Sequence, residues 1–323
     1  MIEEALQMPD LGSGDIIYMC SGQGSQKVGM GADLLDVPEV AAVVECASDV
    51  LGRDMASIMC AEGDDAQAAL DETRNAQAAI AALSIGIGRA LAAREVLPSA
   101  LLGFSLGQVS ALALSGMLSD EDAFALIDVR SRVMDEAARE HPGAMSALLK
   151  ADAASVQELC DACAQDEVLV AANYNCPGQI VISGDASAIE RAELAWKDAG
   201  KRASRLATQG AFHSPLMASA CEPFAAYLET VPFAEPEVPI ICNTDAAILD
   251  AASVRERLVA HLISSVRFDE SVRKLADKGA HTFVEVGYGG VLSGLIRRID
   301  KELERHCVQD RETFDACVAA HCS

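Results

Sequence analysis

Ala100-Leu101-Leu102-Gly103-Phe104-Ser105-Leu106-Gly107 is the stretch of this chain that decides its fold. It leads from an apolar segment through a Gly-x-Ser-x-Gly turn into the helix-like residues 109–114. The order of strand, tight turn and helix predicts that the Ser105 hydroxyl is raised above the edge of a sheet as a nucleophile. A helix that begins at Leu106 would direct its N-terminal amides and positive dipole end towards charge developing on a substrate oxygen. The pentapeptide alone also fits an ordinary glycine-rich turn, so the rest of the chain has to decide.

The composition indicates an acidic globular chain of more than one domain. Its 323 residues exceed an average domain, and an apolar fraction of 51% can supply a sizeable core. A net charge of -24 without a Lys/Arg-rich tract argues against a nucleic-acid or membrane partner. No charged N-terminus precedes a continuous apolar segment, so we expect no signal peptide. The apolar region 76–93 is interrupted by Gln77 and Arg89, which predicts a buried helix and not a membrane span.

Eleven cysteines, an odd number spread along the chain, predict free thiols in a reducing, cytoplasmic compartment. Two groups leave a metal role open. One is Cys160-x-x-Cys163, which has no second pair; the other is the tail with His306, Cys307, Cys317, His321 and Cys322. Neither has the spacing of a zinc module, so we expect no metal.

The order of predicted elements indicates an α/β fold with an insertion. Strand 16–20 runs into the polar loop 21–26, and open α/β sheets bind ligands at such strand ends. A β-α-β-β-α-β order follows, with strands at 144–149, within 168–183 and near 203–207, and helices at 153–164 and 186–199. We therefore expect a hydrolase-like α/β catalytic domain with a mostly parallel sheet, formed by residues 1–140 and 210–323. Residues 141–209 would form an inserted, smaller ferredoxin-like α+β domain.

A serine nucleophile requires a base, and His213 is the best placed of the six histidines. It precedes Ser214-Pro215, a plausible helix N-cap followed by proline at the first helical position. His213 would thus lie on a loop that a helix start holds in place, although a loop histidine without a role remains the alternative. His261 is the second candidate, in a setting that indicates a half-buried helical position.

Arg130 lies on the apolar face of the predicted helix 120–139, three residues after Ile127 and four before Met134. Arg132 points elsewhere, among acidic residues, and is typical of a solvated ion pair. A buried guanidinium without a partner carries a large desolvation penalty. Its partner is either a carboxylate elsewhere in the fold or a carboxylate that arrives with the substrate.

Five sequence blocks stand out along the chain: Gly22-Gln23-Gly24-Ser25-Gln26, Gly103-Phe104-Ser105-Leu106-Gly107, Arg130 within residues 129–134, Phe212-His213-Ser214-Pro215-Leu216-Met217 and Glu285-Val286-Gly287. In this order, they resemble the malonyl-CoA:acyl-carrier-protein transacylase family, whose fold is shared with polyketide acyltransferase domains. Residues 75–77 and 173–179 are similar to further blocks, and the resemblance covers about residues 16 to 298.

The resemblance implies a role for each matched residue. Ser105 would be the acylated nucleophile, His213 its base, and the carbonyl of residue His261 would orient that base. The remaining implied roles are an oxyanion hole formed by the amides of Gln23 and Leu106, a malonyl carboxylate site at Arg130, and a pocket lined by Gln77, Phe104 and Phe212. Phe212 resembles malonyl-selective members, whereas methylmalonyl-selective domains tend to carry serine there.

Four positions depart from the family pattern. Phe104 stands where the family usually has histidine, and His261 where it has glutamine. The first change removes a polar group beside the nucleophile, whereas a backbone carbonyl survives the second. Ser21 and Tyr288 replace prolines, so the loops at both rims of the site would differ.

The implied reaction is ping-pong transfer of a malonyl group from malonyl-CoA to the phosphopantetheine thiol of acyl carrier protein, feeding fatty-acid biosynthesis. The family resemblance implies no cofactor, with malonyl-CoA and CoA as substrate and product, and a monomer. Acyl carrier protein is acidic as a family, so we expect a local basic patch, for which the candidates are Lys197, Lys201, Arg202 and Arg205.

Three alternatives stay open at this point. A serine carboxylesterase or thioesterase of the α/β-hydrolase kind would add an acidic triad member and have no use for Arg130. A polyketide-pathway trans-acyltransferase would share the chemistry but serve another carrier. A catalytically silent acyl-carrier-binding protein would lack the acyl-enzyme altogether.

Overall fold

A computed structural model describes residues 8–208 and 210–321 of the chain. Its larger domain is built on a five-stranded sheet in the order β7-β2-β1-β8-β9, in which all paired strands are parallel. The strands are β1 (Ile16–Cys20), β2 (Pro98–Gly103), β7 (Ile240–Ile241), β8 (Thr282–Val286) and β9 (Glu304–Val308). The predicted α/β class with a parallel sheet is confirmed. Strand β9 lies in the tail that the sequence patterns did not assign.

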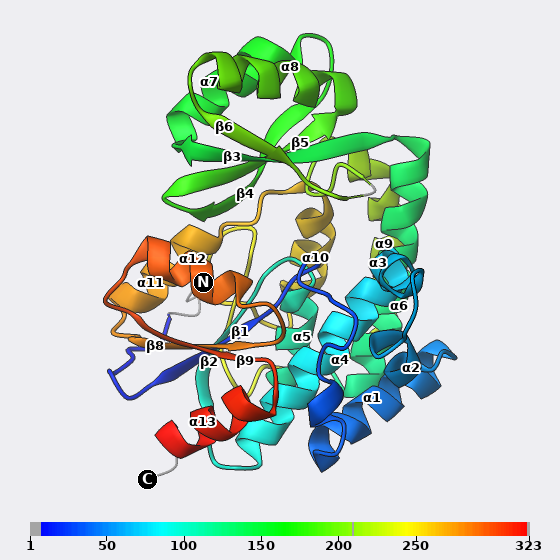
Figure 1. The fold of residues 1–323 in the computed structure, drawn as a ribbon, viewed down its shortest axis with the longest axis vertical. Coiled ribbons are helices and arrows are strands. Elements are labelled where there is room, and N and C mark those ends of the chain that lie inside the picture. The colour runs from blue at the N-terminus through cyan, green and yellow to red at the C-terminus, as the bar shows by residue number, and fades with distance from the viewer. Residues whose placement is uncertain (1–7, 209, 322–323) are drawn as a thin grey trace.

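Helices cover both faces of this sheet (Figure 1). They are α1 (Pro38–Leu51), α2 (Met55–Met59), α3 (Ala66–Asp71), α4 (Thr73–Ala92), α5 (Gly107–Leu114), α6 (Asp120–Glu140), α9 (Cys221–Leu228), α10 (Val254–Ile263), α11 (Phe268–Asp277), α12 (Val291–Ile299) and α13 (Arg311–His321), with the short 3-10 helices η1 (Ala32–Leu34) and η2 (Pro215–Ala220). Within the described residues, no helix is long and apolar enough to cross a bilayer.

Strand β1 is buried along its whole length because it faces two hydrophobic cores. Its side chains alternate between the faces of the sheet, as the period of two requires. Tyr18 and Cys20 belong to the core that contains α4, whereas Ile17 and Met19 belong to the core that contains residues of α11 and α12. The apolar run that the sequence offered at residues 16–20 is therefore a central, doubly covered strand.

The inserted domain has the ferredoxin-like order that the sequence predicted. Its elements are β3 (Gly143–Ala151), α7 (Ala153–Ala164), β4 (Leu169–Cys176), β5 (Gly178–Asp185), α8 (Ala186–Asp198) and β6 (Arg202–Arg205). The strands form an antiparallel sheet in the order β4-β5-β3-β6. Helices α7 and α8 lie on its outer face, away from the larger domain (Figure 1). The boundaries at residues 141 and 209 stay a prediction, and residue 209 lies outside the described residues.

The Gly-x-Ser-x-Gly turn fits its place because its two glycines lack side chains. A Cβ atom on Gly107 would lie 2.0 Å from the carbonyl oxygen of Cys20, at the end of β1. A Cβ on Gly103 would lie 2.1 Å from the amide nitrogen of Gln108. The start of α5 is thus pressed against the end of the central strand.

We expect Gly107→Ala to lower the free energy of unfolding by about 3 kcal/mol, because backbone atoms and not a flexible side chain would have to move. Urea unfolding measures this. The matched control is Gly294→Ala in α12, where a new Cβ would meet nothing within 4 Å. That variant should be as stable as the parent or more so, because alanine favours a helix. Equal midpoints for parent and Gly107→Ala would contradict the prediction.

Candidate active site

A cavity of about 230 Å³ lies between the two domains, at the carboxyl ends of β1 and β2. The larger domain contributes Gln23, Phe104, Ser105, Arg130, Phe212 and His213 to its lining. The inserted domain contributes Met145, Ala147, Asn173, Asn175, Gln179 and Val181. The structure therefore brings most of the predicted site residues to one place. The asparagines and Gln179 lie in a block that the sequence analysis had matched without assigning a role.

Ser105 and His213 form a hydrogen-bonded pair, with 2.8 Å between Oγ and Nε2. The other ring nitrogen, Nδ1, lies 2.9 Å from the carbonyl oxygen of His261. A carbonyl can only accept, so Nδ1 carries the proton and Nε2 is free to accept from the serine hydroxyl. This arrangement can withdraw a proton from Ser105 without an acidic third member.

Both members of this pair have a backbone conformation that L-residues rarely adopt. The φ angle is 52° at Ser105 and 58° at His213, both in the left-handed region. Each such residue costs on the order of 1–3 kcal/mol, so the surrounding structure must hold it in place.

Asn243 holds the turn around Ser105. Its Oδ1 accepts a hydrogen bond from the Ser105 amide at 2.8 Å, and its Nδ2 donates to the carbonyl of Gly103 at 2.7 Å. Its own amide donates to Oε1 of Gln108 at 2.7 Å. Asn243 was not among the site residues predicted from the sequence. The available signal was its place directly after an apolar strand, because parallel strands end at one edge of the sheet.

The loop that carries His213 is held by the helix start that the sequence predicted. Ser214 Oγ accepts from the Leu216 amide at 3.3 Å and donates to the carbonyl of Ala211 at 2.6 Å. Pro215 occupies the first position of the helix. The helix is a 3-10 helix, η2, that continues into α9.

Arg130 is buried, with 2% of its surface exposed, and reaches the nucleophile from α6. Its Nη1 donates to Oε1 of Gln77 at 2.8 Å and its Nη2 to Oγ of Ser105 at 3.3 Å. No carboxylate in the described chain forms an ion pair with it. Burial lowers its pKa to about 10, so the guanidinium remains charged at neutral pH. The first of the two predicted partners of Arg130, a carboxylate elsewhere in the fold, is therefore absent from the described chain.

Gln77 links Arg130 to the glycine-rich loop after β1. Its Nε2 donates to Oε1 of Gln23 at 3.2 Å. The loop is closed by the Gly24 amide, which donates to Oε1 of Gln26 at 2.8 Å, and Nε2 of Gln26 donates to Asp71 at 2.8 Å. Within the described chain, the backbone amides of Gln23 and Leu106 donate to no protein atom. Both amides are therefore available to a ligand oxygen.

Phe104 is an apolar residue and packs on an apolar neighbour. Its ring meets the ring of Phe268 edge-on, with 5.6 Å between centroids. Phe212, 6% exposed, adds a second aromatic surface to the cavity. Where the family usually has a histidine, the cavity is thus lined by a phenylalanine ring that packs on a second ring.

His261 lies behind His213 and does not line the cavity. Its ring is 5.0 Å from the His213 ring, and only 2% of its surface is exposed. The sequence prediction of a half-buried position was wrong, because the packing of α10 against the His213 loop covers the side chain. Burial, together with His213 and Arg130, lowers the pKa of His261 well below its usual range.

Glu285, at the end of β8, ties the glycine-rich loop to α12. Its carboxylate is fully buried and accepts from the amides of Leu292 at 3.1 Å and Ser293 at 2.8 Å. The hydroxyl of Ser21 donates to it at 3.3 Å. Burial raises the pKa of Glu285, and these hydrogen bonds oppose that shift. Ser21, one of the departures from the family pattern, therefore makes a contact that proline could not.

The cysteine and histidine groups do not assemble into a metal site in the described chain, where no three potential ligands gather. Cys160 and Cys163 belong to the core of the inserted domain. In the tail, His306 bonds Glu304 at 3.1 Å and packs edge-on against His321. Cys322 lies outside the described residues.

Comparison with known proteins agrees with this fold and site. The acyl transferase domain family matches residues 17–310. A malonyl CoA-acyl carrier protein transacylase of Bacillus subtilis is 38% identical over 307 residues, which cover 94% of this chain and 96% of the relative. The Haemophilus influenzae protein of that name is 38% identical over 300 residues, which cover 91% and 95%.

Comparison with solved structures also finds malonyl transacylases. A type II PKS acyl-carrier protein complex with its malonyl-transacylase matches with a TM-score of 0.91 at 34% identity, covering 95% of this chain and 99% of that one. A malonyl-CoA:acyl carrier protein transacylase of Xanthomonas oryzae also reaches 0.91 at 34% identity, covering 96% and 99%. The chain belongs to the acyl transferase domain family, and the resemblance found in its sequence is confirmed.

We expect the His213 ring to titrate near pH 4, because burial first and the Arg130 cation second lower its pKa to about 4 from 6.5. NMR of ¹⁵N-histidine-labelled protein measures this, with the resonance assigned from its loss in His213→Gln. The unfolded chain binds this proton more readily, so His213 makes the free energy of unfolding fall as pH drops from about 6.5 towards 4. Titration at an ordinary pKa would contradict the prediction.

Proposed function

We propose that this protein transfers a malonyl group from malonyl-CoA to the phosphopantetheine thiol of acyl carrier protein through a malonyl-Ser105 intermediate. The observation that carries the proposal is Arg130, a buried cation 3.3 Å from the Ser105 hydroxyl with no carboxylate partner in the described chain. A malonyl group bound to Ser105 places a carboxylate within reach of that cation. The names of the relatives support the same activity.

The chemistry follows from the contacts around Ser105. Nε2 of His213 takes the hydroxyl proton as Oγ attacks the thioester carbonyl of malonyl-CoA. The amides of Gln23 and Leu106 receive the oxyanion of the tetrahedral intermediate. Collapse breaks the carbon–sulfur bond, and CoA leaves with the proton from His213. The carrier thiol then gives its proton to His213 and attacks the ester carbonyl of malonyl-Ser105. The carbon–oxygen bond breaks, Oγ of Ser105 takes the proton back from His213, and the malonyl group remains on the carrier sulfur.

The carboxylate of the substrate also assists the base. In the empty site, Arg130 opposes protonation of His213, which it helps to keep neutral. A malonyl carboxylate on the guanidinium compensates this charge, so the imidazolium forms more readily when the correct substrate is bound. The carbonyl of His261 holds Nδ1–H throughout. This carbonyl occupies the place where an α/β-hydrolase esterase would need an acidic residue, which argues against that alternative.

A basic patch smaller than the sequence predicted lies near α8, and it supports docking of the carrier protein there. Arg205 is paired with Glu193 at 2.9 Å, whereas Lys197, Lys201 and Arg202 form no ion pair within the described chain. Lys201 lies over the Trp196 ring, 3.8 Å from its centroid. The chain continues from this patch to Leu206, which lines the cavity. We propose that the carrier protein approaches along this edge.

Three further assignments belong to the proposal. The carrier serves fatty-acid synthesis, with polyketide synthesis as the alternative that the solved carrier complex favours. The protein acts as a monomer in the cytoplasm, in keeping with the ten free cysteines of the described chain. It uses no cofactor, since malonyl-CoA and CoA are substrate and product.

Incubation with malonyl-CoA should yield a malonyl adduct of the intact protein, seen by mass spectrometry, because the acyl-enzyme persists until a carrier thiol attacks it. Ser105→Ala should give no adduct, since the attacking oxygen is gone. Addition of acyl carrier protein should clear the adduct and yield the malonylated carrier. Release of free malonate without a carrier would support an esterase, and no adduct at all would support a silent carrier-binding protein.

Arg130→Ala should reduce the preference for malonyl-CoA over acetyl-CoA by a factor on the order of 100, because acetyl leaves the buried guanidinium unpaired in the parent. Single-turnover acylation rates with both thioesters measure this preference. Arg132→Ala is the matched control, since Arg132 is exposed and pairs with Glu136 at 3.5 Å. An unchanged preference in Arg130→Ala would remove the carboxylate site from the proposal.

A further inference from the structure

The connection between α10 and α11, residues 264–267, is bonded to the inserted domain. Val266 forms a parallel bridge with Asn173 of β4. Its amide donates to the carbonyl of Ala172 at 2.8 Å, and its carbonyl accepts from the amide of Tyr174 at 2.9 Å. The hydroxyl of Ser265 adds a bond of 2.6 Å to the carbonyl of Ala171. Val266 is fully buried, so these backbone bonds are shielded from water.

The same connection lies next to the partner of His213. Helix α10 ends at Ile263, and the last carbonyls of a helix have no donor within it. One of these, the carbonyl of His261, accepts the Nδ1 proton of His213 at 2.9 Å. Ser265 is the fourth residue after His261. The bonds to β4 set the direction in which the chain leaves α10. They thereby also set the position of the His261 carbonyl, which orients the base.

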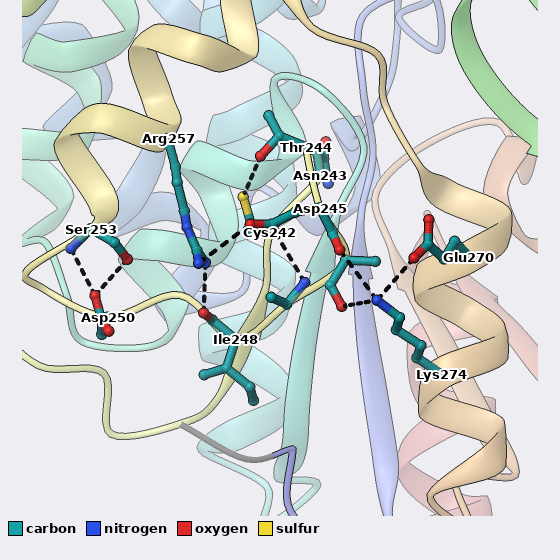
Figure 2. Close-up of polar contacts among 12 residues, drawn as sticks. Cys242, Asn243, Thr244, Asp245, Ile248, Asp250, Ser253, Arg257, Glu270 and Lys274 are labelled. Atoms are coloured by element: carbon teal, nitrogen blue, oxygen red, sulfur yellow. Dashed lines mark hydrogen bonds and ion pairs between the residues drawn. The ribbon is translucent and has the colours of Figure 1, made fainter. Parts of the chain in front are cut away.

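The connection also reaches the turn around Ser105. The amide of Arg267 donates to the carbonyl of Asn243 at 2.8 Å, and the side chain of Asn243 holds Ser105. Figure 2 shows how α10 and α11 hold the turn that carries Asn243. Arg257 of α10 donates to the carbonyl of Ile248 at 2.7 Å, and Lys274 of α11 donates to that of Asp245 at 3.2 Å.

We infer that residues 264–267 fix both members of the Ser105–His213 pair relative to the inserted domain, and that Ser265 is a positioning residue of the reaction. β4, the strand to which they bond, also lines the cavity through Asn173 and Asn175. The wall that meets the substrate and the carbonyl that orients the base therefore belong to one hydrogen-bonded unit. Loss of the Ser265 bond lets the end of α10 move, which misaligns His213 without altering any group that touches the substrate. The effect on rate rests on the proposed function, whereas the effect on His213 does not.

Ser265→Ala tests this inference. We expect the maximal single-turnover rate of Ser105 acylation to fall about three- to tenfold, the effect of one lost hydrogen bond in positioning, with the half-saturating malonyl-CoA concentration unchanged. We also expect the NMR resonance of the His213 Nδ1 proton to move, because its bond to His261 changes. Ser265→Thr keeps a hydroxyl and should restore both values.

Ser187→Ala is the matched control. Ser187 lies on α8 of the inserted domain, outside residues 264–267, and its hydroxyl donates to Glu167 at 2.5 Å, so this variant also loses one side-chain hydrogen bond, and both measurements should equal those of the parent. A parental rate and a parental His213 resonance in Ser265→Ala would overturn the inference, as would equal losses in Ser187→Ala. If the parent forms no malonyl adduct, the proposed function fails, and the His213 resonance still decides the inference.

Discussion

The close approach of α5 to the end of β1 is the constraint on which the site depends. No side chain fits at Gly107, because the carbonyl of Cys20 occupies the place of its Cβ. This contact forces Ser105 into the left-handed region and presents its amide to Asn243. The parallel sheet then adds the other parts, since its strands all end at this edge. The glycine-rich loop follows β1, the serine turn follows β2, and Asn243 follows β7.

The electrostatics of the site show a second constraint, which favours function over stability. Burial, and after it the Arg130 cation, lowers the pKa of His213, and the charge of Arg130 itself is uncompensated in the described chain. Neither effect helps the chain to fold. In the proposed reaction, one substrate carboxylate would offset the charge of Arg130 and its effect on His213, so a carboxylate-bearing acyl group would remove part of this penalty when it binds. Strain of this kind concentrates at functional sites in natural proteins.

Local patterns predicted much of this architecture. The apolar run of β1, the glycines around Ser105, the stripe that carries Arg130 and the helix start after His213 each lie within a short window of sequence. The contacts made by Asn243, Ser265 and Glu285 do not, because each depends on which strand ends meet or which domain lies opposite. Strand β9 escaped notice for another reason: as an edge strand it is mostly polar and partly exposed.

Two departures from the family pattern meet at the same structural joint. Phe104 packs on Phe268, the first residue of α11, directly after the connection that bonds to β4. His261 packs on His213 from the last turn of α10, directly before that connection. Phe104 and His261 therefore add ring contacts on both sides of residues 264–267, whereas the family usually has histidine and glutamine at these two positions. Because ring contacts are less directional than hydrogen bonds, the precise alignment of the pair falls to the backbone bonds of the connection itself.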